Sequence, residues 1–345
     1  IREFLCSESM HHLGVPTTRA LSLVGTGDAV VRDMFYDGHP EAEPGAIVCR
    51  VAPSFIRFGT FELPASRGDT VLLRQLAAVC IARDFPAPAE LGDARHARWF
   101  AEICERTAVL VAHWMRVGFV HGVMNTDNLS ILGLTIDYGP YGWVEDYDPE
   151  WTPNTTDAQG RRYRFGTQPQ VAYWNLTRLA QALAPLFEDV TPLHDGLARF
   201  QQVHAQCERA DIAAKLGLDV CRDEDVALMA AWLEILHEGE MDMTLAFRGL
   251  MALDPASPSV AVLEEAFYSP ARREAVLPSL QAWLQQYAAR LRAEDLSVQA
   301  RQQQTGRATP VYVLRNPPAQ EAIEPAEQGD PNVVEPRRAG LRPPC

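Results

Sequence analysis

Apolar residues recur every three to four positions over several stretches of the chain, the spacing that places them on one face of a helix. In residues 95–117, for example, Phe100, Cys104, Ala108 and Val111 follow this spacing. The same pattern predicts helices in three further stretches, residues 1–12, 70–83 and most of 169–300. The last stretch is expected to break near three positions, Pro192, Gly217 and Pro255.

Between the first two predicted helices the chain has the character of strands, with short apolar stretches separated by turn-forming residues. These stretches are Leu21–Val24, Ala29–Phe35 and Ala46–Val51. The segment Gly25-Thr26-Gly27-Asp28 separates the first two, and we expect it to form a hairpin turn. Residues 140–168 are polar and rich in Pro, Gly, Asn and Asp, which predicts a long irregular segment.

A helix with antiparallel strands, followed by a mainly helical chain, predicts an α+β fold. We divide the chain into a small lobe over residues 1–63, a helical lobe over residues 64–301 and a Pro-rich tail over residues 302–345. The tail carries Pro317-Pro318 and Pro325 around a short helix-like stretch, and a proline inside a helix costs about 3 kcal/mol or more. We therefore expect the tail to be poorly ordered.

Composition narrows the class of protein. The chain has 345 residues, of which 47% are apolar and 22% charged, as in soluble globular proteins. Its net charge of −14 argues against a nucleic acid or an anionic membrane surface as a partner. No apolar run approaches the ~20 residues that span a bilayer. The start, IREFLCSES, has neither a basic region nor an apolar core, so we expect no signal peptide and a chain that begins within a domain.

Seven cysteines are scattered along the chain, without a CxxC pair or the spacing of zinc ligands. They are Cys6, Cys49, Cys80, Cys104, Cys207, Cys221 and Cys345. Most lie in apolar or helical stretches, where a free buried thiol is the usual state, and this suits a reducing compartment. Cys345 could be redox-active, but a free terminal thiol is the simpler interpretation.

The stretch HGVMNTDNLSILGLTIDYGPYG, which begins at His121, places three polar groups in an apolar background. Asp127 and Asn128 lie on a turn, an apolar run follows, and Asp137 stands two residues before a glycine. A kinase catalytic loop, a short hairpin and a second metal-binding carboxylate have this order. Carboxylate and amide oxygens are the hard ligands that Mg²⁺ prefers.

The spacing agrees with the kinase pattern at one position and departs from it at another. In H-R-D-L-x-x-x-N the asparagine lies seven residues after the histidine, as Asn128 does after His121. The base of that pattern lies two residues after the histidine, where this chain has Val123. Asp127 is the only carboxylate in the loop that could replace it, and we interpret His121 as a structural loop residue. By the kinase pattern alone, the chain would be a pseudokinase.

Longer sequence segments, in a fixed order, carry a more specific resemblance. HGVMNTDN, TIDYGPYGW, DYDP, TPNTTD, RYRFGTQPQVAYWNL and RLAQALAPLF resemble the selenoprotein O family, nearly continuously from Ile1 to about Phe187 and more weakly beyond. The resemblance implies a protein-kinase-like fold with a partial small lobe and a large helical lobe. It also implies a protein adenylyltransferase that uses ATP and Mg²⁺, with Mn²⁺ as the alternative metal. Such an enzyme attaches AMP to Ser, Thr or Tyr hydroxyls of proteins and releases pyrophosphate.

The resemblance assigns roles to the three polar groups. Asp127 resembles the catalytic acceptor of the hydroxyl proton. Asn128 and Asp137 resemble the Mg²⁺ ligands, with Asp137 also at the nucleotide. Without the family, the same residues are an Asx-rich turn followed by a hairpin with solvated carboxylates.

The resemblance also implies two nucleotide-binding arginines, Arg50 and Arg57, in CRVAPSFIRFG. Arginine suits bidentate contact with phosphate, but a pair held in structural salt bridges is the alternative. Glu3 in IREFL resembles the helix glutamate that pairs with a nucleotide-binding lysine. No lysine precedes Glu3, because the only lysine of the chain is Lys215.

The missing lysine and Gly-rich loop predict that the first strands of a nucleotide-binding lobe are absent, with weak or no transfer by this chain. Apolar strand edges should then be exposed around Val30–Phe35 and Ile47–Val51. A kinase-like phosphotransferase and a non-catalytic pseudokinase scaffold remain alternative functions. Expected partners are ATP and protein substrates, with no nucleic acid and no membrane, and the expected location is cytoplasmic, or mitochondrial for a eukaryotic source. Trp143 and Trp174 are expected to be core or loop anchors.

Overall fold

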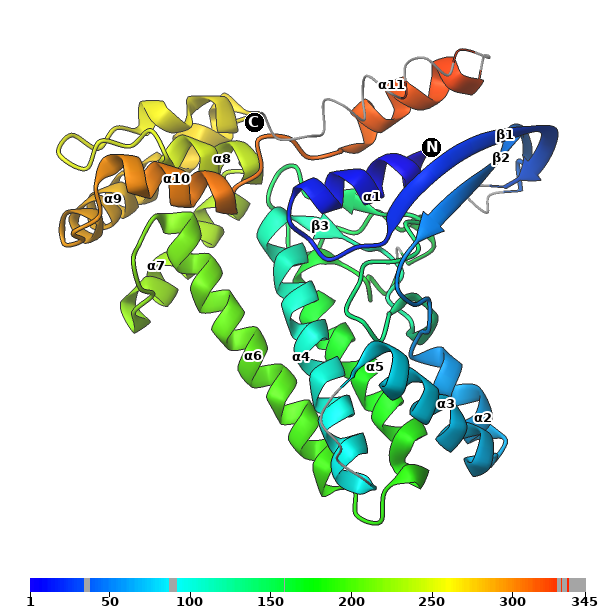
Figure 1. Ribbon diagram of the computed structural model, residues 1–345. Coiled ribbons are helices and arrows are strands. Elements are labelled where there is room, and N and C mark those ends of the chain that lie inside the picture. Colours follow the sequence, from blue (N-terminus) through cyan, green and yellow to red (C-terminus); the bar gives the residue numbers. More distant parts are fainter. Residues whose placement is uncertain (34–37, 87–91, 158, 328–329, 331–333, 335–345) are drawn as a thin grey trace.

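Three long helices run side by side through the middle of the molecule (Figure 1). They are α4 (Asp93–Val117), α5 (Gln168–Leu183) and α6 (Thr191–Leu216). The computed structural model describes residues 1–33, 38–86, 92–157, 159–327, 330 and 334. Over these residues the structure is mainly helical with two small antiparallel sheets, in agreement with the predicted α+β class.

Helices lie where the apolar periodicity predicts them. α1 (Arg2–His12) and α3 (Thr70–Asp84) match their predicted bounds closely, and α4 covers the third predicted helix. α4 ends at Gly118, whose φ of 74° is left-handed and therefore favours a residue without a side chain. Two predicted breaks are confirmed, because Pro192 stands in the first turn of α6 and Gly217 caps its end.

The strands near the N-terminus form one antiparallel ribbon of β1 (Arg19–Arg32) and β2 (Glu41–Val51). The hairpin turn predicted at Gly25-Thr26-Gly27-Asp28 is wrong, because β1 runs straight through these residues. The pairing register shifts across them, and the Thr26 hydroxyl donates to the Gly45 carbonyl at 3.2 Å. Pairing with β2 on both sides, at Gly25 and at Ala29, holds the segment as an irregularity within a strand, in which Gly27 has a left-handed φ of 82°.

The ribbon presents apolar side chains to solvent, as predicted for these strands. Val30, Val31, Ile47 and Val51 are all exposed. Residues 34 and 35 of the predicted edge lie outside the described part of the chain.

A short helix, α2 (Gly59–Ser66), follows the ribbon and packs against α3 and α5. The predicted boundary at residue 63 falls inside α2, and the one at residue 301 falls inside α10 (Val298–Ala308). The division of the chain at these residues stays a prediction.

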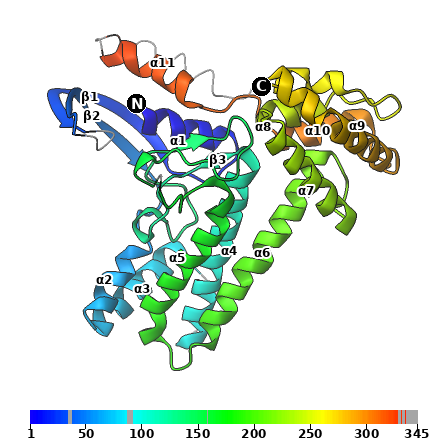
Figure 2. The same ribbon diagram turned by 180° about the vertical axis from the view of Figure 1, so that it is seen from behind.

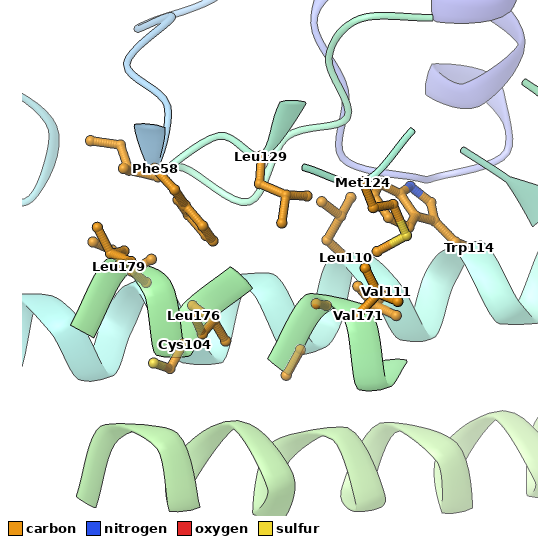
Figure 3. Packing of buried hydrophobic residues seen from close by; sticks show 14 of the residues in the cluster. Phe58, Cys104, Leu110, Val111, Trp114, Met124, Leu129, Val171, Leu176 and Leu179 are labelled. Atoms are coloured by element: carbon orange, nitrogen blue, oxygen red, sulfur yellow. The ribbon is translucent and has the colours of Figure 1, made fainter. Parts of the chain in front are cut away.

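The larger of two groups of buried apolar side chains supports the predicted active-site loop. Figure 3 shows Phe58, Met124 and Leu129 of the loop region packed over α4 and α5. All three are removed from water, with at most 1% exposed. The loop between Met124 and Leu129 is therefore anchored at both ends on rigid helices.

The second group of buried side chains lies among the helices that follow α6, seen from behind in Figure 2. These helices are α7 (Asp223–Glu238), α8 (Met243–Leu250) and α9 (Pro270–Arg292). At its centre the rings of Trp232 and Trp283 stack with centroids 4.4 Å apart.

A minimal sheet joins the two ends of the predicted active-site stretch. β3 (Phe119–Val120) pairs antiparallel with β4 (Gly142–Trp143). Trp143 is buried, which confirms it as an anchor. From β4 to the start of α5, the described residues contain only short 3-10 turns, so the irregular segment predicted there is confirmed.

Helices α10 and α11 (Asn316–Glu327) occupy the tail for which poor order is predicted, so that prediction is wrong for residues 302–327. Pro317-Pro318 lie in the first turn of α11, where a helix needs no N–H donors, and so they do not oppose it. Ala322 is fully buried, and α11 contacts α1 (Figure 1). Cys345 lies outside the described residues. Among the described helices, none has an apolar stretch long enough to cross a membrane.

Candidate active site

The predicted polar groups lie on a loop and a small hairpin whose geometry local hydrogen bonds determine. The side chain of Asn125 accepts the backbone N–H of Asp127 at 3.1 Å and opens the 3-10 turn η1 (Thr126–Asn128). Leu129 then pairs antiparallel with Thr135, and so the hairpin brings Asn128 back beside Ile136, next to Asp137.

His121 holds this loop and is not placed as a base. Its side chain is fully buried, and Nε2 lies 2.9 Å from the Ile136 carbonyl, which can only accept a hydrogen bond. Its backbone N–H donates to the Gln168 side chain at 3.0 Å. Burial lowers the pKa of His121, which keeps the imidazole neutral with its proton on Nε2. The interpretation of His121 as a structural residue is confirmed.

Asn128 has one side-chain group engaged with the loop. Its Nδ2 donates to the Val123 carbonyl at 3.0 Å. This bond orients the amide and leaves its oxygen, the group that can ligate a hard cation, for another partner.

Asp137 is the point at which the predicted groups converge. Its backbone has a φ of 60°, a left-handed value uncommon for a residue with a side chain. Its carboxylate lies 3.6 Å from Arg50 and 3.2 Å from Arg57, measured from each Nη1. The spacing of Arg50 and Arg57 in the sequence does not by itself place them on the same side of the chain. The fold brings both to the carboxylate of Asp137.

Each arginine also forms a hydrogen bond with a further predicted site residue. Arg57 Nη1 donates to the backbone carbonyl of Asp127 at 2.7 Å. Arg50 Nη1 donates to Glu3 at 3.0 Å, so Glu3 has an arginine partner from β2. These charged side chains, other than that of Asp127, are between about a fifth and a third exposed. Ion pairs this exposed contribute little to stability, so the arginines can exchange Asp137 for a ligand at small cost.

The carboxylate of Asp127 is exposed and lies directly over the first residue of α2. A Cβ added at Gly59 would stand 2.1 Å from Asp127 Oδ1, far inside any real contact. Only glycine leaves space for the carboxylate in this position. The sequence analysis did not single out Gly59, although it follows two residues after Arg57 in IRFGTFE.

Three other residues that no sequence pattern singled out connect the loop to the helices. The Thr126 hydroxyl donates to Glu62 of α2 at 2.6 Å. Glu62 in turn accepts from Arg178 of α5 at 3.3 Å. No spacing rule links these three positions, which come from three separate elements.

The lone lysine is remote from this cluster. Lys215 is buried in α6 with its Nζ 3.9 Å from the centroid of the Phe247 ring, in the second core. The cationic side chains that the described residues bring to Asp137 are therefore arginines.

The donor set at Asn128 and Asp137 fits a hard divalent cation. Both offer oxygen atoms, and the Asn128 amide is oriented by its own hydrogen bond. Within the described residues, no cluster of three or more His, Cys, Asp or Glu side chains could hold a metal. A cation here would complete its shell with phosphate oxygens and water, as Mg²⁺ commonly does.

Comparisons with known proteins identify the family of the chain. A family model described as protein adenylyltransferase SelO matches residues 1–336. The chain is 71% identical over 335 residues to a protein nucleotidyltransferase YdiU of Xanthomonas axonopodis pv. citri. It is 69% identical over 335 residues to the protein of that name from Xanthomonas euvesicatoria pv. vesicatoria. Each match covers 97% of this chain and 65% of the relative, so the chain spans about 65% of the length of these curated relatives. The family match thus continues well past Phe187, further than the resembling sequence segments alone indicate.

Proposed function

The chain belongs to the protein adenylyltransferase SelO family, and we propose that it carries the active site of a Mg²⁺-dependent transfer of AMP from ATP to Ser, Thr or Tyr hydroxyls of proteins. The observation that carries the proposal is the convergence on Asp137 of Arg50 and Arg57, the latter also bonded to Asp127. A kinase-like arrangement of small and large lobes around this cluster is part of the proposal.

Asp127 is the proposed proton acceptor. Its carboxylate is exposed while its backbone carbonyl is held by Arg57, so the side chain is free to meet a hydroxyl on an incoming protein. As the hydroxyl oxygen bonds to the α-phosphorus and pyrophosphate leaves, the hydroxyl proton passes to Asp127. Holding the hydroxyl in position beside the carboxylate supplies much of the rate.

Asn128 and Asp137 are the proposed metal ligands. A bound Mg²⁺, or Mn²⁺ as the alternative, would neutralise charge on the phosphates and on the pyrophosphate leaving group. The amide of Asn128, fixed by the Val123 carbonyl, presents an oxygen to the metal without further ordering.

Arg50 and Arg57 are the proposed phosphate clamp. In the described structure each has Asp137 as an anionic partner. With a cation held by the Asp137 carboxylate, the guanidinium groups of Arg50 and Arg57 would be available for phosphate oxygens, for which their planar geometry is suited. Glu3 keeps Arg50 in place through its 3.0 Å contact.

The reaction product tests the proposal. Because the chain spans 65% of its relatives, we use an extended chimera, defined as this chain joined to the segments of the Xanthomonas axonopodis relative that the match does not cover. With Mg-ATP and a mixture of proteins, label from the α-phosphate should appear on protein and pyrophosphate should be released. Label from the γ-phosphate on protein, with ADP released, would establish a phosphotransferase instead.

The same proposal sets the partners and the location. ATP and hydroxyl-bearing proteins are the substrates, and a cytoplasmic location is supported by the six described cysteines, which are all free thiols.

A further inference from the structure

Trp174, predicted to be a core or loop anchor, lies on α5 and is not in the core. Its side chain is 44% exposed. The guanidinium of Arg162 lies 4.2 Å from the ring centroid, and that of Arg178 lies 5.9 Å from it. Both distances are in the range of cation–π attraction, so the ring presents a flat apolar surface beside two cations. Tryptophan and arginine are the residues that most often dominate the energy of protein contacts.

The cations at this surface are not all neutralised by the protein itself. Arg162 is exposed and forms no ion pair within the described residues, whereas its neighbour Arg161 donates to the Glu150 carbonyl and Arg164 pairs with the Glu150 carboxylate. Arg178 is partly engaged by Glu62. In a chain of net charge −14, the exposed Trp174 ring thus carries two guanidinium groups, of which Arg162 is without an acidic partner among the described residues; we call Arg162, Trp174 and Arg178 the patch.

The patch lies next to the proposed proton acceptor. Arg178 stands one helical turn after Trp174 and contacts Glu62 at 3.3 Å. Glu62 accepts the hydroxyl of Thr126 at 2.6 Å, and Thr126 is the residue before Asp127. A peptide segment of a few residues can therefore contact the patch while its hydroxyl lies at Asp127.

We propose that Arg162, Trp174 and Arg178 bind an acidic segment of the protein substrate, flanking the hydroxyl that receives AMP. Acidic side chains pair with Arg162 and Arg178, and the peptide's apolar or backbone atoms cover the Trp174 ring. This inference rests on the proposed function, whose protein substrate it defines more closely. A peptide is favoured over a nucleic acid because Arg178 is linked through Glu62 and Thr126 to Asp127, the proposed acceptor of the proton from a protein hydroxyl.

Binding to the 345-residue chain tests the inference without requiring catalysis. The probe is a fluorescein-labelled peptide with a central Ser flanked by Asp and Glu, and its control has Asn and Gln in their place. Anisotropy should show tighter binding of the acidic peptide, decreasing with salt. Arg162→Gln should weaken binding about tenfold, the equivalent of ~1.4 kcal/mol. Trp174→Phe should retain most of the affinity and Trp174→Ala should lose it, because the ring face carries the contact.

A matched control removes the same charge elsewhere. Arg272→Gln changes an exposed arginine in the first turn of α9, and affinity for the acidic peptide should be unchanged. Equal affinities for the two peptides, or equal losses in the Arg162 and Arg272 variants, would overturn the inference. Competition by a single-stranded oligonucleotide of the same charge, at the same concentration as the unlabelled acidic peptide, would replace it with a nucleic-acid site.

The transfer assay separates this inference from the proposed function. If the extended chimera attaches AMP to acidic and neutral peptides with equal kcat/KM, the acidic-substrate inference fails and the proposed function stands. If the acidic peptide binds but no α-phosphate label reaches protein, the patch stands and the proposed function fails.

Discussion

Gly59→Ala should lower AMP transfer without lowering stability. The added methyl carbon would stand 2.1 Å from Asp127 Oδ1, whereas real contacts of this kind are not closer than 3.0 Å. Asp127 is exposed, so its carboxylate can move aside by about 1 Å or rotate to another conformer. A displacement of about 1 Å at a reacting group costs on the order of 10²-fold in rate.

Stability should change in the opposite direction or hardly at all. Gly59 is the first residue of α2, and alanine is favoured over glycine in a helix by up to ~1 kcal/mol. The melting temperature of the 345-residue chain should therefore stay the same or rise slightly. A rate loss with an intact melting temperature distinguishes displacement of Asp127 from a general folding defect.

The assay measures label from the α-phosphate of ATP on protein, using the extended chimera. Gly306→Ala in α10 is the matched control, because its added Cβ meets only the end of the Met251 side chain, at 3.4 Å. The control should transfer at the unsubstituted rate. Unchanged transfer by the Gly59→Ala chimera would refute the placement of Asp127 at the reacting hydroxyl.

Four further predictions concern the site and the interior. In the extended chimera, Asp137→Ala should abolish metal-dependent nucleotide binding and transfer, since a methyl group cannot ligate a hard cation; unchanged Mg²⁺ dependence would remove Asp137 from the site. Calorimetry of the 345-residue chain with Mg-ATP should show weak or no binding, because its only lysine lies over Phe247; micromolar affinity would show that the arginines suffice. Burial lowers the pKa of Lys215 from 10.5 to about 7. Between pH 7 and pH 10.5 the unfolded chain therefore binds more protons than the folded chain, so the free energy of unfolding should rise with pH in this range. Lys215→Met removes this titration, so the free energy of unfolding of the variant relative to that of the unsubstituted chain should fall from pH 7 towards pH 10; a constant difference in denaturant titrations would contradict the shift. Phe58→Ala should destabilise by ~3–5 kcal/mol in the same titrations, because its ring is fully buried over α4 and α5, and a loss below ~1 kcal/mol would mean that the loop is not anchored there.

Local pattern determined the helices of this protein and the residues of its candidate site. Apolar periodicity is a property of consecutive residues, so α1, α3 and α4 could be placed from it within a few residues. The order of Asp127, Asn128 and Asp137 is likewise local, because one loop and one hairpin carry all three. Sequence resemblance also identified the family, which the comparisons bear out over nearly the whole chain.

Neighbours from distant parts of the chain decided the remaining features. Gly25 to Asp28 has the composition of a turn, yet the hydrogen bonds of β2 keep it within a strand. Prolines predicted poor order in the tail, but Pro317 and Pro318 lie in the first turn of α11, which removes their conflict with a helix, and Pro325 lies inside the helix near its end. In both cases local preference was overruled by hydrogen bonding or by position within the element, neither of which composition reveals.

The chemistry of the site depended on tertiary structure in the same way. The sequence offers Glu3, Arg50 and Asp137 at widely separated positions, and only packing brings them within hydrogen-bonding or ion-pairing distance. Gly59 lies beside Asp127 because α2 packs against the turn that carries Asp127. The spacing of residues along the chain does not indicate this contact. The sequence therefore determined which side chains are available, while the fold decided which of them meet, because contact energies depend on distance in space and not along the chain.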